Sequence, residues 1–86
     1  MKWIKYESQA YMDMYPEVGY RMFDSLENAK AWAKHMQENW SGTCVILGYA
    51  TQEEILEYIK KYNIEPEERV MYDILNKENY EDNSLL

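Results

Sequence analysis

The chain has very little cysteine and histidine, two residues on which many catalytic and metal sites depend. Cys44 is the only cysteine, so no disulfide can form within the chain. His35 is the only histidine, and neither a cysteine nor another histidine lies at ligand spacing from it. A protein metal site needs several such ligands that converge on one point. We therefore expect no catalytic residues, no metal, no cofactor and no enzymatic activity.

Glycine and long apolar runs are also scarce. The three glycines are scattered at Gly19, Gly42 and Gly48, so they cannot form the glycine-rich loop that cradles a phosphate. No apolar run approaches the length of a membrane span, and residues 1–5 lack the apolar stretch of a signal peptide. These absences predict a cytoplasmic protein with no membrane partner.

Basic residues are outnumbered by acidic ones. Residues 1–50 contain six acids and five bases, a net charge of −1, whereas residues 51–86 contain ten acids and four bases, a net charge of −6. An acidic surface repels the phosphates of nucleic acids, so direct nucleic-acid binding is disfavoured. The same surface attracts basic partners, including a basic nucleic-acid-binding protein.

The residues that are abundant indicate one folded domain with a contact-rich surface. Hydrophobic residues make up 47% of the 86 positions, which is enough for one packed core. Much of this content is nine tyrosines, six methionines and three tryptophans, residues that are common at half-exposed positions. We expect a single α+β domain over residues 1–78 and a flexible C-terminal tail over residues 79–86, where no periodicity is visible.

The first half of the chain shows strand and helix patterns in turn. Apolar residues alternate over residues 3–14, a turn follows, and residues 19–23 form a second short strand, which together predict an antiparallel hairpin. Asp24 is the expected N-cap of a helix, with a capping box and an apolar face. The uninterrupted apolar run 43–49 predicts a strand covered on both faces and therefore central in its sheet. The expected inward face of the helix consists of Leu26, Ala29, Trp32, Ala33 and Met36, and Ser41-Gly42 is its expected end.

The second half contains two helix patterns. Thr51 and Glu54 form a second capping box, which opens a helix to about Tyr62. Pro66 suits the first turn of a further helix that runs to about Lys77. The predicted fold is a small three-stranded sheet, antiparallel or mixed, packed against about three helices in the order β-β-α-β-α-α. Its expected buried residues in these helices are Ile55, Ile59, Tyr62, Val70, Met71, Ile74 and Leu75.

Acidic residues cluster in these two helices. Glu57 lies four residues before Lys61 and is expected to pair with it. The glutamates expected to remain uncompensated are Glu53, Glu54, Glu65, Glu67 and Glu68. Acids in first helical turns also favour the helix dipole, so an ordinary solubilising surface is one interpretation. The other is a partner-binding surface with two tyrosine anchors, comprising Glu53, Glu54, Glu57, Glu65, Glu67, Glu68, Tyr58 and Tyr72.

The leading functional hypothesis is a non-catalytic, acidic, protein-binding inhibitor. Its carboxylates would imitate a phosphate backbone and occupy the basic groove of a nucleic-acid-binding protein, with long-range attraction speeding association. Mobile elements, phages among them, use small decoys of this kind against host defence proteins, so an anti-CRISPR or anti-restriction role is consistent with the size and charge.

Aromatic residues of the expected hairpin suggest an alternative surface. At least one side of a hairpin faces outward unless a helix covers it, so an exposed row of rings could bind a nucleotide-like small ligand. The same rings could instead mediate self-association, as in a homodimer or a self-assembling structural module. The residues concerned are Trp3, Tyr11, Tyr15 and Tyr20.

Overall fold

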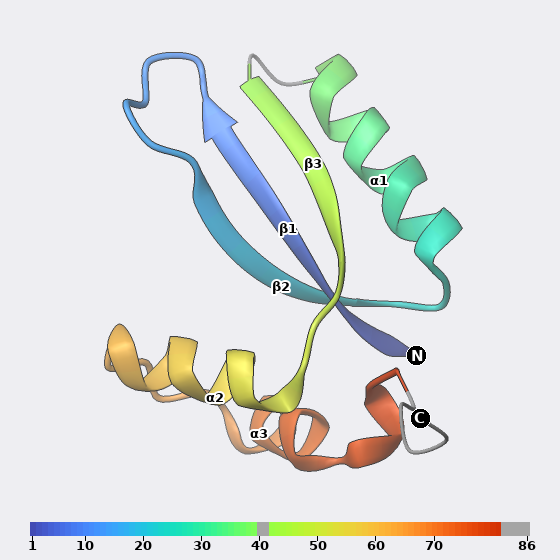
Figure 1. Cartoon of the computed structure of the whole chain (residues 1–86), viewed down its shortest axis with the longest axis vertical. Coiled ribbons are helices and arrows are strands. Elements are labelled where there is room, and N and C mark those ends of the chain that lie inside the picture. Colours follow the sequence, from blue (N-terminus) through green and yellow to red (C-terminus); the bar gives the residue numbers. More distant parts are fainter. Residues whose placement is uncertain (40–41, 82–86) are drawn as a thin grey trace.

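The computed structural model describes residues 1–39 and 42–81, and these residues form an α+β fold (Figure 1). Three strands make one antiparallel sheet, and the elements follow in the predicted order β-β-α-β-α-α. The predicted fold class is therefore confirmed. The strands are β1 (Lys2–Ala10), β2 (Glu17–Phe23) and β3 (Gly42–Tyr49), and the helices are α1 (Leu26–Asn39), α2 (Gln52–Lys61), α3 (Glu68–Leu75) and the short 3-10 helix η1 (Lys77–Asn79).

The strand order is β2-β1-β3, so β1 is central and β3 lies at an edge. The prediction that the apolar run forms the central strand is wrong. Along β3, Cys44 is buried under α1, whereas Val45 and Leu47 on the opposite side are 52% and 48% exposed. An apolar run shows that a strand tolerates burial, but it does not fix which strands pair with it.

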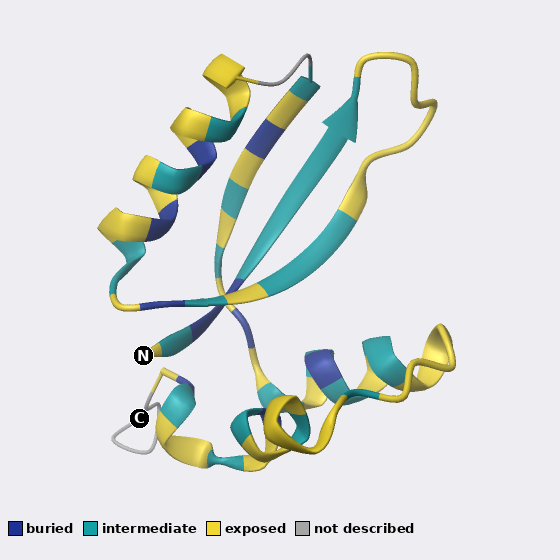
Figure 2. Cartoon of the chain, turned by 180° about the vertical axis from the view of Figure 1, so that it is seen from behind, coloured by how far each residue is buried: buried dark blue, intermediate teal, exposed yellow. Residues whose placement is uncertain are grey.

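Two hydrophobic clusters lie on opposite faces of the sheet. Consecutive residues of a strand point to opposite faces, and on β1 both Trp3 and Ile4 are buried. Ile4 packs with Phe23 and Ala29 under α1. Trp3 belongs to the other cluster, which includes Ile55 and the helices that follow β3. The buried end of β1 therefore joins two packed layers, while the distal half of the sheet is only partly covered (Figure 2).

The first hairpin and α1 differ from the prediction at their ends. β1 and β2 pair as expected, but β1 ends at Ala10, so Met12 and Met14 lie in the connecting loop. The cap of α1 is Ser25, not Asp24, because the Ser25 hydroxyl accepts a hydrogen bond from the Asn28 backbone N–H at 3.0 Å. α1 ends at Asn39; of its predicted stop, Ser41 lies outside the described residues and Gly42 begins β3.

The capping box of α2 is confirmed, but the predicted inward face of this helix is only partly correct. The Thr51 hydroxyl accepts from the Glu54 backbone N–H at 3.2 Å, and the Glu54 carboxylate accepts from the Thr51 N–H at 3.1 Å. Ile55 is buried as expected, whereas Tyr62 is 58% exposed. The helix ends at Lys61, Tyr62 is its C-cap residue, and Asn63 takes a positive φ of 50°, so Tyr62 lies just past the helix and not on its inward face.

α3 is shorter than expected, and the ordered chain extends past residue 78. Pro66 precedes the N-cap, so the helix begins at Glu68, and only Met71 and Ile74 of the predicted face point inward. Val70 and Leu75 are 39% and 52% exposed. Tyr80 is buried beside η1, which corrects the predicted boundary of the tail; residues 82–86 lie outside the described part.

Candidate functional site

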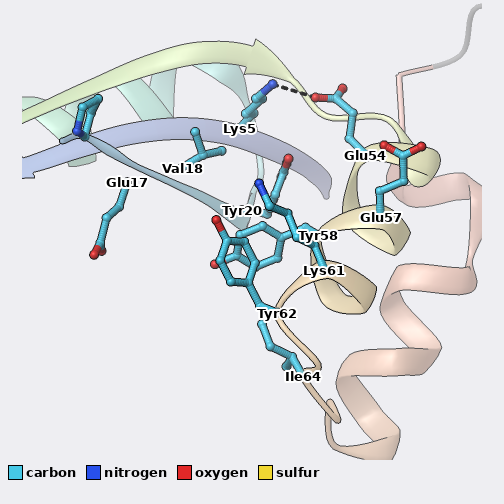
Figure 3. A pocket seen from close by; sticks show the side chains of 11 residues that line it. Lys5, Glu17, Val18, Tyr20, Glu54, Glu57, Tyr58, Lys61, Tyr62 and Ile64 are labelled. Atoms are coloured by element: carbon cyan, nitrogen blue, oxygen red, sulfur yellow. Dashed lines mark hydrogen bonds and ion pairs between the residues drawn. The ribbon is translucent and has the colours of Figure 1, made fainter.

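A groove lies at the corner between the sheet and α2 (Figure 3). It has a volume of about 720 Å³ and is open to solvent. One wall is the β2 side of the sheet, which contributes Val18 and Tyr20, and the other is the exposed side of α2. We call this feature the corner groove. Its α2 wall is formed by Glu54, Glu57, Tyr58 and Lys61, followed by Tyr62 just after the helix.

Three tyrosines form a continuous row in the corner groove. The rings of Tyr20 and Tyr58 meet edge to face with centroids 5.2 Å apart, and those of Tyr58 and Tyr62 lie 4.9 Å apart. Burial raises the pKa of Tyr20 above its ordinary value, which disfavours the charged form of this hydroxyl. The Lys61 ammonium lies 5.4 Å from the centroid of the Tyr62 ring. The row thus already presents a ring face to a cation.

An ion pair closes the inner end of the corner groove. The Lys5 ammonium of β1 donates to the Glu54 carboxylate at 2.8 Å, and this is the one ion pair within residues 1–39 and 42–81. The contact lowers the pKa of Glu54 and raises that of Lys5. The expectation that Glu54 is uncompensated is therefore wrong. Its carboxylate forms an ion pair with Lys5 and also accepts the hydrogen bond from the Thr51 N–H in the capping box. No local pattern indicates this pair, since the two residues are 49 positions apart.

The other predicted carboxylates lie exposed on the α2–α3 layer. The expected pairing of Glu57 with Lys61 does not form, and Glu57 lines the corner groove. Over the described ranges, none of these carboxylates lies within ion-pair distance of a lysine or arginine. Because the layer occupies one end of the molecule, the excess negative charge of residues 51–81 is concentrated there (Figure 1). The exposed glutamates are Glu53, Glu57, Glu65, Glu67 and Glu68.

The two tyrosine anchors predicted for this surface are in different environments. Tyr58 is half-buried within the tyrosine row of the corner groove. Tyr72 is 68% exposed on α3, where it is accessible to a partner. The structure therefore does not bring the two anchors together in the corner groove, and of the two only Tyr72 is exposed beside the acidic residues of this layer.

The alternative aromatic surface is divided by the fold. Trp3 is only 8% exposed and its indole N–H donates to the Asp73 carbonyl at 3.0 Å, so it belongs to the core and its assignment to a surface was wrong. Tyr20 lies in the corner groove. Tyr11 and Tyr15 lie in the loop of residues 11–16, which we call the hairpin tip, and each is 76% exposed.

The hairpin tip is strongly apolar and has an ordered base. Met12 and Met14 are 86% and 82% exposed, so four large apolar side chains stand in solvent within one short loop. The Asp13 N–H donates to the Ala10 carbonyl at 3.0 Å, which fixes the start of the loop. Sequence reasoning assigned the two methionines to a strand and therefore missed this surface.

The described residues show no cluster of reactive or metal-ligating side chains outside these surfaces. Cys44 is buried, and burial raises the pKa of its thiol, which disfavours the reactive thiolate. Within residues 1–39 and 42–81, no three histidine, cysteine or acidic side chains converge as a metal would require. No helix in these ranges has both the length and the apolar character needed to cross a bilayer.

Comparison with known proteins adds no functional information. The chain matches no protein-family model, no curated protein and no solved structure. What the arrangement can do chemically therefore follows from its surfaces alone. They comprise an exposed acidic layer, a groove with a row of tyrosines, and an apolar hairpin tip.

Proposed function

We propose that this domain is a non-catalytic protein-binding inhibitor that engages the basic, nucleic-acid-binding surface of its partner through the carboxylates of the α2–α3 layer. The observation that carries the proposal is the state of those carboxylates. Glu65, Glu67 and Glu68 are exposed and, within the described chain, have no lysine or arginine within ion-pair distance. Such groups keep their charge available for a partner's cations, as the phosphates of a nucleic acid do.

The physical basis is electrostatic attraction between two whole surfaces. An excess of negative charge at one end of the molecule raises the rate of encounter with a positively charged groove. Exposed tyrosines such as Tyr72 can then anchor the contact, since tyrosine is enriched among the residues that dominate binding energies. Partners that fit this description include restriction and CRISPR effector proteins, and a mobile element would be the expected source of such a decoy.

The proposal predicts that this domain displaces duplex DNA from a basic partner. We would measure the fluorescence anisotropy of a labelled duplex bound to each of a panel of restriction and CRISPR effectors. Added domain should lower the anisotropy, and more domain should be needed as salt rises. The triple variant Glu65→Gln, Glu67→Gln and Glu68→Gln should require at least about threefold more protein, since each exposed charge pair contributes roughly 0.2–1 kcal/mol.

A matched control variant distinguishes the effect of where the acidic residues lie from the effect of the total net charge. Asp24, Glu27 and Glu38 are also exposed but lie around α1. Changing them to Asn, Gln and Gln raises the net charge from −7 to −4, as the first triple variant does. This control should displace the duplex like the unmodified domain. Equal weakening by both variants, or no displacement from any panel member, would contradict the proposal.

Two other functions receive unequal support. A nucleotide-like ligand would need a slot between rings, but Tyr20, Tyr58 and Tyr62 contact one another, and the nearby carboxylates disfavour a phosphate. Self-association is supported by the hairpin tip, whose apolar side chains are more exposed than a monomer requires. The salt dependence of each process distinguishes them, because charge attraction weakens with salt and apolar association does not.

A further inference from the structure

The corner groove combines aromatic rings with carboxylates that are not paired. Glu57 of α2 and Glu17 of β2 lie on either side of the tyrosines (Figure 3). Both side chains are exposed, and no lysine or arginine of the described residues lies within ion-pair distance of either. The third carboxylate, Glu54, is occupied by Lys5. Lys61 also lines the groove and lies over the Tyr62 ring, but it is outside ion-pair distance of both carboxylates. An entering cation therefore competes with Lys61 for the ring, whereas Glu17 and Glu57 have no lysine or arginine partner to displace.

The ring row favours a particular kind of cation. Tyr62 is 58% exposed, and Lys61 of the same chain lies over its ring. A guanidinium group is planar, so it can stack on such a ring and also form hydrogen bonds to a carboxylate at its edge. A lysine ammonium can lie over the ring, but it is not planar and cannot stack on the ring and form paired hydrogen bonds to the carboxylate at the same time. Arginine therefore fits the groove better than lysine.

The position of the groove beside the sheet indicates which kind of chain segment could present an arginine side chain to it. β2 is an edge strand, and the groove runs beside its first residues, where the molecule is open to solvent. An extended segment of another protein can approach along this edge without displacing any element of the fold. Lys5 and Glu54 neutralise each other, which leaves Glu17 and Glu57 against Lys61, so the groove keeps a net negative charge that argues against a free phosphate or nucleotide.

We propose that the corner groove is a seat for an arginine side chain carried on an extended segment of the partner, held between the Tyr58–Tyr62 ring pair and Glu57. The proposal rests on the proposed function, because it specifies where one basic residue of the partner binds. It adds a site on the β2 side of α2 to the contacts made by Glu65, Glu67 and Glu68.

The test is an NMR titration of the ¹⁵N-labelled domain with a short blocked peptide that contains one arginine. Two control peptides have the same sequence. One carries lysine in place of the arginine, and the other carries citrulline, which has the same shape as arginine but no charge. The arginine peptide should shift the amide signals of Glu57, Tyr58 and Tyr62, the lysine peptide should shift them less, and the citrulline peptide should not shift them. Shifts confined to Glu65, Glu67 and Glu68, or equal shifts with citrulline, would overturn the proposal.

Variants locate the contact within the groove. Tyr62→Ala should weaken binding of the arginine peptide about two- to five-fold, the range expected for an exposed cation–π contact, and Tyr62→Phe should retain it. Glu57→Gln should weaken binding by a similar factor without removing any ring. Because Glu57 and Tyr62 are exposed, both changes should leave the amide signals of residues outside the corner groove unchanged. Unaltered affinity in both variants would show that the groove is not the seat.

The two proposals can fail separately. Displacement of DNA from basic proteins without any peptide-induced shift in the corner groove overturns the arginine seat alone. Peptide binding in the groove without displacement of DNA from any panel member overturns the proposed inhibitory function and leaves the seat supported. In the triple variant Glu65→Gln, Glu67→Gln and Glu68→Gln, the groove should still bind the arginine peptide, because these residues do not line it.

Discussion

Tyr80, near the end of the described chain, contributes to the hydrophobic core although its sequence context does not indicate this. Residues 79–86 lack periodicity, yet Tyr80 is buried and its hydroxyl donates to the Ile74 carbonyl. A three-residue 3-10 turn, too short to produce a pattern, directs this ring into the core. The capping box at Thr51 was predictable because both partners lie within one turn. The Tyr80 contact was not, because it depends on tertiary packing.

The buried tyrosine predicts a specific dependence of stability on pH. Burial raises the pKa of Tyr80 to about 12, whereas an unfolded tyrosine ionises near its ordinary value of about 10. Below pH 10 both states hold the proton, so its contribution is complete. As the pH rises from about 10 towards about 12, the unfolded state loses the proton first, and stability falls.

Tyr80→Phe isolates this effect in urea unfolding followed by circular dichroism. At pH 8 the variant should be less stable by about 0.5–1.5 kcal/mol, because it loses the hydrogen bond to Ile74. That difference should shrink as the pH rises above 10, since phenylalanine has no proton to lose. Tyr6 and Tyr20 also have raised pKa values, but they are common to both proteins and cancel. A difference that is constant from pH 8 to pH 11 would contradict the assignment, and Tyr72→Phe should change little at any pH.

At the scale of elements, the sequence predicted which segments form strands better than it predicted their neighbours. The run 43–49 is a strand, but its edge position and its irregular pairing with β1 were not visible. The register of the two strands shifts between Lys5 and Tyr6, and nearby Gly48 takes a φ of 131°. Such a bulge depends on how two distant segments meet, whereas alternation and capping depend on neighbouring residues.

Gly48 should be required for its backbone conformation and not for lack of space. A Cβ atom at this position would meet no heavy atom within 4 Å, but a φ of 131° is rarely adopted by L-residues. Gly48→Ala should therefore lower the free energy of unfolding by about 1–3 kcal/mol. A chemically synthesised chain with D-alanine at this position should recover most of that loss, because D-residues favour positive φ. Equal destabilisation by both alanines in thermal unfolding would point to side-chain contacts instead.

For the whole molecule, charge was predictable and the site was not. The excess acid of the second half can be counted in the sequence, and the structure places it in one layer beyond the sheet (Figure 1). The corner groove arises only when the sheet and α2 meet, through contacts such as Lys5 of β1 with Glu54 and Tyr20 of β2 with Tyr58. These pairs are distant in sequence, so no local pattern could reveal them.

Self-association through the hairpin tip should strengthen as salt is raised, whereas partner binding through the acidic layer should weaken. At a net charge of −7, copies of this chain repel one another at low ionic strength. Salt shortens the range of that repulsion from about 10 Å at 0.1 M to about 3 Å at 1 M, while apolar attraction persists. Sedimentation velocity should therefore show a higher average mass at 1 M than at 0.1 M sodium chloride.

The residues responsible for this association can be tested against an exposed control residue on another part of the surface. Met12→Ser combined with Met14→Ser should abolish the increase in mass, because these side chains are 86% and 82% exposed at the hairpin tip. Tyr72→Ser on α3 should preserve the increase, although Tyr72 is 68% exposed as well. A mass that stays monomeric at every salt concentration would exclude association through the tip. Loss of association in both variants would instead indicate general surface hydrophobicity, because Tyr72 lies on a helix and contributes nothing to the apolar surface of residues 11–16.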